Sequence, residues 1–157
     1  MNIVADGEKQ RFAAQNKKAF HDYYVLETFE AGIELFGTEV KSIRQGRLNL
    51  KDSWCSVEKG ELFVYGMHIS PYEQGNIFNR DPLRPKKLLM HKHEIMRLFG
   101  EYQQKGLAII PISVYFKKGK AKMSIGLCKG KKIYDKREAM AKKDAMMEAG
   151  RDSAKYL

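Results

Sequence analysis

The chain has 157 residues, which is enough for one compact domain and too few for two sizeable ones. Apolar residues make up 43% of the sequence and charged residues 31%, so a packed core is expected and a wholly disordered chain is excluded. The formal net charge of +10 favours a polyanionic partner, either a nucleic acid or an anionic membrane surface.

Residues 1–15 form an N-terminal extension in which no motif is recognisable. The segment from Met1 to Glu8 lacks the basic and apolar regions of a signal peptide. Later in the chain, the longest apolar run, from Leu107 to Phe116, is interrupted by Pro111 and is shorter than the roughly 20 residues that span a bilayer. We therefore expect neither a secreted nor a membrane-spanning protein, and no membrane partner.

The central part of the chain alternates short apolar runs with turn residues, a pattern typical of antiparallel strands. Three hairpins are predicted, each from two runs that flank a short break: 23–29 with 33–36, 54–58 with 62–69, and 107–116 with 120–127. In the last run, Met123, Ile125 and Leu127 alternate with polar residues or glycine. This period of two predicts one buried face and one basic face, the latter carrying Lys120 and Lys122.

Two short helices interrupt the predicted strands. The first begins at Gly37 and ends near Gly46, and the second runs from about His91 to Lys105. About six short strands with two or three short helices indicate a mainly β fold, a closed antiparallel Greek-key barrel of the oligonucleotide-binding class. We assign residues 16–129 to this barrel domain.

Residues 130–157 are predicted to form a C-terminal tail, because they contain few large residues that could build a core. Asp135 and Glu138 have the spacing of a capping box, which predicts that a helix starts there. A single helix of this length is marginally stable in water, so we expect the tail to be disordered or partly helical when free and to order on a partner.

Most of the net charge lies in one stretch of the chain. Between Lys117 and Lys143 there are eleven Lys and Arg residues and only two acidic ones, which leaves a net charge of +1 for all the other residues together. A surface that serves only solubility usually mixes the two signs, so a localised basic stretch favours the binding of a polyanion.

Residue types that carry catalysis or bind metals show no recognisable arrangement. His91 and His93 stand two residues apart and lack the i, i+4 spacing that places two metal ligands on one helix face. Cys55 follows Trp54 in an apolar run and is interpreted as a core residue. Two cysteines, Cys55 and Cys128, are too few for a disulfide framework, so a reducing cytoplasm is expected. We predict no enzyme, no metal and no cofactor.

Three cationic clusters predict RNA binding, in residues 16–23, 84–89 and 130–137, and the first and third also contain aromatic residues. Aromatic rings stack on unpaired bases and neighbouring cations neutralise phosphates, so the combination suits single-stranded RNA. We expect one RNA-binding face to be formed by Asn16, Lys17, Lys18, His21 and Lys87. A further basic contribution is expected from the predicted hairpin that carries Lys120 and Lys122.

Eight segments of the chain, in order, resemble the SsrA-binding protein family, also called small protein B. They are NKKA (16–19), HDY (21–23), FEAG (29–32), GTEVKS (37–42), NLKDS (49–53), HISPY (68–72), DPLRPKKLL (81–89) and GKKIYDKR (130–137). The resemblance is collinear from Asn16 to Arg137 and so covers most of the chain. It does not extend to residues 144–157, whose formal charge is −1, whereas the family's tail is generally basic throughout.

The resemblance implies an oligonucleotide-binding barrel that binds the tRNA-like domain of transfer-messenger RNA. Such a protein delivers this RNA to stalled bacterial ribosomes for trans-translation, which combines ribosome rescue with peptide tagging. It also implies that Asn16, Glu30 and Leu89 take part in RNA binding. By the same resemblance, alanyl-tRNA synthetase and elongation factor Tu act on the same RNA. We also expect a monomer without catalysis of its own.

In the family, the tail enters the decoding centre and the mRNA channel of the small ribosomal subunit as a helix. By this resemblance the ribosome-binding residues are Lys129, Gly130, Lys131, Lys132, Tyr134, Asp135, Lys136 and Arg137. Tyr134 lies between cations and has little core to join, so we expect it to stack on a ribosomal RNA base.

The chemistry of three candidate residues leaves several roles open. Asn16 offers a donor and an acceptor to a base edge or a ribose hydroxyl. Glu30 either orients a neighbouring cation, accepts from a base amino group, or caps a turn before Ala31-Gly32. Leu89 packs against a base or, as we favour, in the core.

Two alternative functions stay open at this point. One is a generic barrel protein of the initiation-factor type, which touches ribosomes without a dedicated RNA. The other, less favoured, is a small RNA-processing enzyme. Sequencing the RNA that co-purifies with the protein separates them from the transfer-messenger RNA partner, because only the latter predicts one dominant RNA with a tRNA-like end.

Overall fold

Strands are the main secondary structure of the computed structural model, which describes residues 2–3 and 9–131. The strands are β1 (Asn2–Ile3), β2 (Lys9–Gln15), β3 (Tyr23–Ile33), β4 (Leu48–Asn49), β5 (Trp54–Glu58), β6 (Glu61–Tyr65), β7 (His68–Ile69), β8 (Lys86–Leu89), β9 (Ala108–Lys117) and β10 (Lys120–Gly130). The helices are α1 (Lys17–Asp22), α2 (Gly37–Arg44) and α3 (Lys92–Lys105), with a 3-10 turn, η1 (Asn76–Phe78). The predicted mainly β fold is confirmed.

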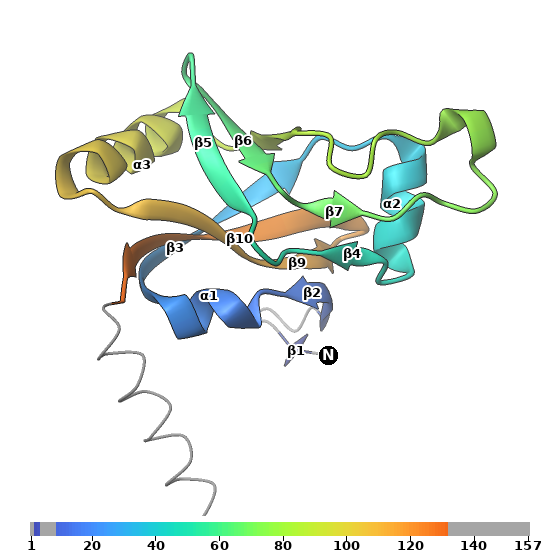
Figure 1. The fold of residues 1–157 in the computed structure, drawn as a ribbon, viewed down its shortest axis with the longest axis horizontal. Helices are drawn as coiled ribbons and strands as arrows, with labels where there is room; N and C mark the ends of the chain where they lie inside the picture. The colour runs from blue at the N-terminus through green and yellow to red at the C-terminus, as the bar shows by residue number, and fades with distance from the viewer. Residues whose placement is uncertain (1, 4–8, 132–157) are drawn as a thin grey trace, which may run out of the picture.

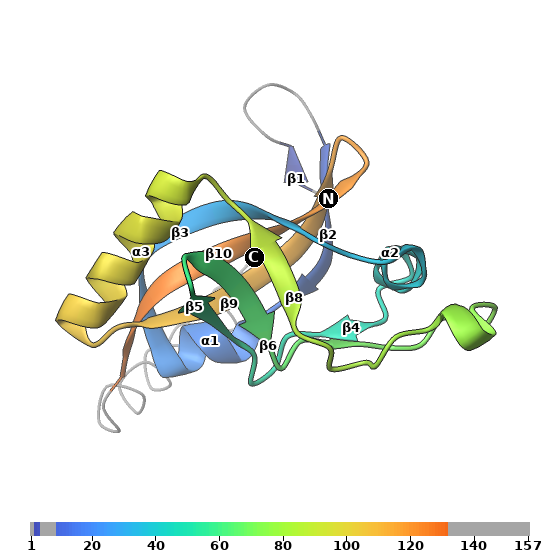
Figure 2. The same cartoon turned by 90° about the horizontal axis from the view of Figure 1, so that it is seen from above.

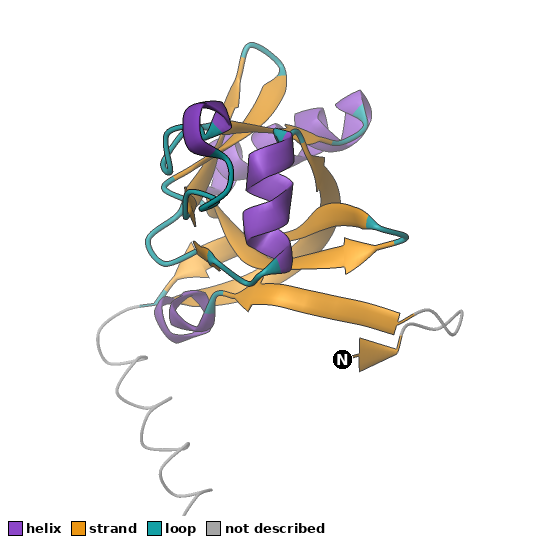
Figure 3. Cartoon of the chain, turned by 90° about the vertical axis from the view of Figure 1, so that its right-hand side faces the viewer, coloured by secondary structure: helices purple, strands orange, loops and turns teal. Residues whose placement is uncertain are grey.

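The strands pair antiparallel and form a curled sheet. Among the described residues, eight strands follow one another in the order β1-β2-β9-β10-β3-β8-β6-β5, and β4 pairs separately with β7. Helices α2 and α3 lie at opposite ends of this sheet (Figures 1 and 2), and α2 covers one end of the curl (Figure 3). Strand β5 comes close to β9, but no strand pairing joins them in the described part of the chain. The sheet is open, so the closed barrel expected from the sequence is not confirmed.

Strand β10 lies in the middle of the sheet, between β9 and β3. Its residues Met123, Ile125 and Leu127 are all buried, as the period of two predicts. The predicted hairpin with β9 is confirmed, and β9 continues through Pro111 because the register with β10 shifts next to it. A bulge of this kind accommodates a proline, which has no N–H to donate within the sheet.

The predicted break at Ala31-Gly32 is wrong. Strand β3 continues through both residues, and Gly32 pairs with Lys122 of β10 on one side and with Leu89 of β8 on the other. A Cβ atom on Gly32 would lie 3.3 Å from the Leu89 Cβ, so the glycine allows close approach of β8 rather than a turn. The predicted run 33–36 therefore leads from the end of β3 into α2.

The remaining predicted elements form, with some changes in where strands begin and end. The predicted hairpin of 54–58 with 62–69 forms as β5 and β6, but Gly66, at φ +74°, separates β6 from β7. Both predicted helices form, and Gly106, at φ +61°, ends α3 in the left-handed conformation. Strand β2 pairs with β9, so residues 9–15 belong to the sheet rather than to an extension outside it.

The core occupies both faces of the sheet. The larger cluster lies inside the curl and includes Ile43 of α2 and Leu98 of α3, both fully buried. A smaller cluster lies on the other face, where Ala19 of α1 packs near Ile112 and Cys128. The six-residue helix α1, which the sequence did not predict, is thus held by packing against the sheet. No helix in the described ranges is long and apolar enough to cross a membrane.

Candidate nucleic-acid interface

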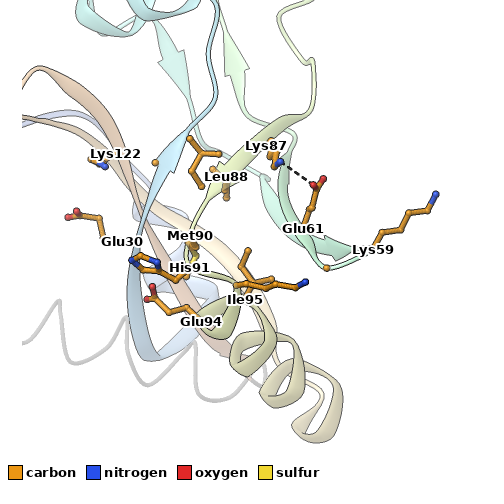
Figure 4. A pocket seen from close by; sticks show the side chains of 14 residues that line it. Glu30, Lys59, Glu61, Lys87, Leu88, Met90, His91, Glu94, Ile95 and Lys122 are labelled. Carbon is orange, nitrogen blue, oxygen red and sulfur yellow. Dashed lines mark hydrogen bonds and ion pairs between the residues drawn. The ribbon is translucent and has the colours of Figure 1, made fainter.

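A groove of about 810 Å³, which we call the β8 groove, lies where β3, β8 and β10 meet the start of α3 and the β5–β6 turn. Its lining residues are Glu30, Gly32, Lys59, Gly60, Glu61, Lys87, Leu88, Leu89, Met90, His91, Lys92, Glu94, Ile95 and Lys122. Glu30 and Lys122 lie on one side of it and Lys59 and Lys87 on the other (Figure 4). Four of the predicted RNA-binding residues therefore come together here: Glu30, Lys87, Leu89 and Lys122.

The alternation of β8 decides which of its side chains reach the groove. Lys86 and Leu88 point inward and are buried, so Lys87 and Leu89 point outward. Leu89 is 50% exposed, and the favoured expectation that it packs in the core is wrong. The alternation explains the error, because Lys86 and Leu88 take the inward positions of this short strand.

Glu30 is held by groups from β9. It accepts a hydrogen bond from the Tyr115 hydroxyl, and the Lys117 Nζ lies 3.8 Å from one of its carboxylate oxygens. Burial, followed by the hydrogen bond to Glu30, raises the pKa of Tyr115, so this hydroxyl stays protonated and donates. Because β3 has no turn at this point, a turn-capping role for Glu30 is wrong. Its contacts agree with the alternative in which it orients a neighbouring cation.

The groove combines cations with exposed apolar surface. Lysines 59, 87, 92 and 122 line it together with three glutamates, and the Lys87 Nζ lies 3.1 Å from a carboxylate oxygen of Glu61. Leu89 and Met90 supply apolar surface between them. Cations that can reach phosphates beside apolar surface that can contact base faces suit a folded RNA better than a small apolar ligand.

Asn16 is nearly buried, and its expected contact with RNA stays a prediction. It is 5% exposed, and its side-chain oxygen accepts a hydrogen bond from the Ala19 N–H at 3.2 Å as the N-cap of α1. Its amide nitrogen donates to the carbonyl oxygens of Pro111 at 2.9 Å and Leu50 at 3.3 Å. All three bonds are inside the protein and hold α1 in position.

A second hollow, the α1 cavity, has a volume of about 230 Å³ and lies beside this helix. Its lining residues are Asn16, Lys18, Ala19, Asp22, Tyr23, Asp52, Ser53, Trp54 and Ile110. The Lys18 Nζ donates to Asp52 at 2.7 Å, which raises the pKa of Lys18 and lowers that of Asp52. Lys17 and His21 are exposed on the same helix, and His21 Nδ1 lies 2.9 Å from Asp22 Oδ1.

The structure divides the single RNA-binding face expected from the sequence into two surfaces. Lys18 lines the α1 cavity and Lys87 lines the β8 groove, and the two hollows share no lining residue. Lys120 is exposed beside the β9–β10 turn and lines neither hollow. The residues expected to form one RNA-binding face therefore lie at two separate hollows, and their joint contact with RNA stays a prediction.

The predicted ribosome-binding residues begin inside the sheet. Lys129 and Gly130 pair with Tyr24 and Tyr23 at the end of β10. Lys131 then contacts α1: its backbone N–H donates to the Asp22 carbonyl oxygen at 2.9 Å and its Nζ to the Phe20 carbonyl oxygen at 3.1 Å. The remaining candidates lie outside the described residues: Lys132, Tyr134, Asp135, Lys136 and Arg137.

The histidines and cysteines show no catalytic arrangement in the described part of the chain. The rings of His91 and His93 stack with centroids 5.6 Å apart, and no group of three potential metal ligands occurs among residues 2–3 and 9–131. Burial raises the pKa of the Cys55 thiol, and it raises that of Cys128 to about 11. Both thiols are therefore protonated at neutral pH, and the interpretation of Cys55 as a core residue is confirmed.

Trp54 is the site residue that sequence reasoning missed. This residue is 50% exposed and lines the α1 cavity. Alternation along β5 was the signal available, because a buried Cys55 places Trp54 on the outward face.

A curled antiparallel sheet with lysines beside exposed apolar and aromatic side chains at two hollows defines a β-rich protein of the nucleic-acid-binding class. The family model described as "SmpB protein" matches residues 13–155, and the chain belongs to this family.

Similar proteins cover most of the chain. The SsrA-binding protein of Acetivibrio thermocellus is 61% identical over 144 residues, which is 92% of this chain and 94% of the relative. The SsrA-binding protein of Carboxydothermus hydrogenoformans is 63% identical over 139 residues, which is 88% of this chain and 93% of the relative. A solved structure described as "tmRNA-SmpB: a journey to the center of the bacterial ribosome" superposes with a TM-score of 0.67 at 48% identity, covering 81% of this chain and 93% of that one.

Proposed function

We propose that this protein binds the tRNA-like domain of transfer-messenger RNA and delivers that RNA to stalled bacterial ribosomes for trans-translation, without catalysing a reaction itself. Membership of the SmpB family supports the proposal, together with relatives named SsrA-binding proteins and the similarity to a transfer-messenger RNA complex of the ribosome. The observation that carries it is the convergence of Glu30, Lys87, Leu89 and Lys122 on one groove.

The two surfaces take different parts in this proposal. The β8 groove binds the tRNA-like domain, with Lys87 and Lys122 neutralising phosphates and Leu89 packing against a base. The α1 surface, with Lys17, Lys18 and His21, contacts RNA beside the point where the tail begins. The tail, with the candidate residues from Lys129 to Arg137, enters the decoding centre and the mRNA channel of the small subunit.

Several finer features belong to the same proposal. The protein works in the cytoplasm as a monomer, and its sheet acts as an oligonucleotide-binding scaffold. Alanyl-tRNA synthetase and elongation factor Tu act on the same transfer-messenger RNA while it is bound. The two cysteines support the cytoplasm, and the family resemblance supports the enzymes that act on the same RNA. Cell fractionation, sedimentation, and competition on one RNA test the location, the monomer and the shared RNA.

The binding of purified transfer-messenger RNA at a series of salt concentrations tests the groove. Replacing Lys122 by Gln removes one cation from the groove, so one phosphate fewer is neutralised. The slope of log affinity against log salt should therefore become less negative by roughly 0.7–0.9. Replacing Lys105, at the far end of the 14-residue α3, by Gln removes the same charge outside the groove and should leave the slope unchanged.

A competitor separates this function from generic RNA binding. An excess of an unrelated structured RNA of equal length should displace little of the bound transfer-messenger RNA at physiological salt. Equal competition by both RNAs would contradict the proposal and support the generic ribosome-binding alternative. A slope that changes as much for Lys105→Gln as for Lys122→Gln would remove the groove from the binding site.

A further inference from the structure

Trp54 has an unusual position for the single tryptophan of a small protein. It is the first residue of β5 and is 50% exposed, whereas its neighbour Cys55 is 5% exposed. A tryptophan whose purpose was to fill the core would be buried, because its ring brings a large apolar area out of water. The exposure of this ring therefore needs another explanation.

The Trp54 ring is held in place from one side. It stacks on Tyr65 of β6 with ring centroids 5.7 Å apart and an interplanar angle of 16°. The Tyr65 hydroxyl donates to the carboxylate of Glu58, whose oxygens lie 2.7 and 2.8 Å away. At Gly66, a Cβ atom would lie 3.1 Å from the Trp54 ring, so this glycine lets the backbone pass close to it.

Trp54 lines the α1 cavity, and its stacking partner Tyr65 does not. The segment that leads into β5 contacts α1, because Lys18 of α1 donates to Asp52. Polar residues line the same cavity: the Lys18–Asp52 ion pair, Asn16, Asp22 and Ser53. Lys17 is exposed on the adjoining helix.

We propose that Trp54 is a stacking platform for one unpaired RNA base that enters the α1 cavity. Any base can stack on the indole, while Lys17 and Lys18 neutralise the flanking phosphates. The carboxylate of Asp52 accepts from an exocyclic amino group, which favours adenine, cytosine or guanine over uracil. The inference rests on the proposed function and adds to it a base-binding site that is separate from the β8 groove.

The emission of Trp54 tests the proposal directly, because no other tryptophan contributes. The full chain is titrated with transfer-messenger RNA and, in a second arm, with small ribosomal subunits. Quenching that saturates with binding in either arm supports stacking and identifies which RNA supplies the base. Binding that saturates in both arms by an independent assay, with unchanged emission, overturns the proposal while leaving the proposed function intact.

Variants give a second readout that does not depend on fluorescence. Trp54→Ala should weaken binding of the quenching RNA by about 5- to 150-fold, the range for loss of one stacked base, whereas Trp54→Phe should retain most of the affinity. Phe78→Ala removes another exposed ring, 69% exposed on η1 near α2, and should have no effect.

Folding is checked by circular dichroism and thermal melting of each variant. Equal affinity for folded Trp54→Ala and wild type, in both arms, overturns the proposal. Equal weakening by Trp54→Ala and Phe78→Ala does so as well, because it would indicate a general dependence on exposed rings. Loss of RNA binding in wild type itself would instead count against the proposed function.

Discussion

Lys86 places an amine in the interior of the sheet. The residue has 0% exposure, and its Nζ donates to the Met67 carbonyl oxygen at 2.7 Å and to that of Pro82 at 3.4 Å. Burial lowers the pKa of Lys86 from 10.5 to about 8, with Glu39 opposing this shift and Arg84 adding to it. The amine therefore ties β8 to the segments around it at some cost in desolvation.

This pKa makes stability depend on pH in a defined direction. Below pH 8 the folded and unfolded chains both hold the proton, so Lys86 contributes no pH dependence. Between about pH 8 and 10.5 the unfolded chain holds more protons, so the free energy of unfolding should rise with pH, by at most about 1.4 kcal/mol per unit. Urea unfolding from pH 7 to 10 measures this.

Lys86→Met is the matched variant for this prediction, because methionine has a similar length and no titrating group. The difference in unfolding free energy between wild type and variant cancels the other titrating residues, and it should change with pH only above about 8. Parallel pH profiles of the two proteins would show that Lys86 keeps its ordinary pKa.

Among the elements, α1 is short and depends on a single residue for its position. Asn16 caps the helix and also ties it to β9 and to the Leu50 carbonyl. Asn16→Ala should lower the free energy of unfolding by about 2–4 kcal/mol, since it removes the cap of α1 and the two bonds that the amide nitrogen donates to the Pro111 and Leu50 carbonyl oxygens. Urea denaturation checks this, with the exposed Lys17→Ala, expected within about 0.5 kcal/mol of wild type, as control.

Comparing the stability and the RNA affinity of Asn16→Ala with those of Lys17→Ala separates two roles of Asn16. A normally stable Asn16→Ala protein that nevertheless binds RNA poorly would return this residue to the RNA interface. A destabilised protein that binds normally well below its melting temperature would confirm the positioning role.

Two glycines of β10 provide a test of packing in the central strand. A Cβ atom on Gly126 would lie 2.9 Å from the Ile112 Cδ1 and 3.0 Å from the Cys128 Sγ, whereas at Gly130 nothing lies within 4 Å. Gly126→Ala should therefore cost about 1–3 kcal/mol of stability, and Gly130→Ala should change it by less than about 0.5 kcal/mol. Thermal and urea unfolding compare them; equal effects would mean that the sheet adjusts freely around Ile112.

At the scale of elements, local patterns were predictable and distant pairings were not. The hairpins β5–β6 and β9–β10 join neighbouring segments, so alternation and a turn glycine suffice to predict them. The pairings of β3 with β10 and of β2 with β9 depend on packing across the whole sheet. Helix α1 has only six residues, too few for a periodic signal.

The same distinction applies to the candidate site. The cationic clusters were visible in the sequence, and so were Lys87 and Lys122 as individual cations. Their division between two hollows follows from the strand order, which no local pattern contains. The inward or outward direction of Leu89 and Trp54 depends on register, and a shift of one residue reverses it.

On the scale of the whole molecule, Lys131 connects the end of β10 to α1. Lys131 is bound to the carbonyl groups of Phe20 and Asp22, so it belongs with the sheet rather than with the residues after it. A stop after Lys131 should keep fold and RNA affinity but abolish peptide tagging on stalled ribosomes, because the residues proposed to enter the mRNA channel are gone. Affinity and tagging are measured on the same preparation.

A stop after Lys129 is the companion to that truncation. It also removes Gly130, which pairs with Tyr23, and the contacts of Lys131 with α1, so it should melt at a lower temperature than the longer truncation. If tagging survives in either protein, residues 132–157 are dispensable and the proposed division between RNA binding and ribosome entry is wrong.

The position of β10 also governs when the protein can fold during its own synthesis. Tyr23 pairs with Gly130 and Gly32 with Lys122, so β3 leaves the ribosome about a hundred residues before its central partner exists. Until then β2 lacks β9 as well, and the N-terminal half carries unpaired strand edges that chaperones or aggregation partners can occupy. The pairings of β2 and β3 with the central strands can therefore form only late in the synthesis of the chain.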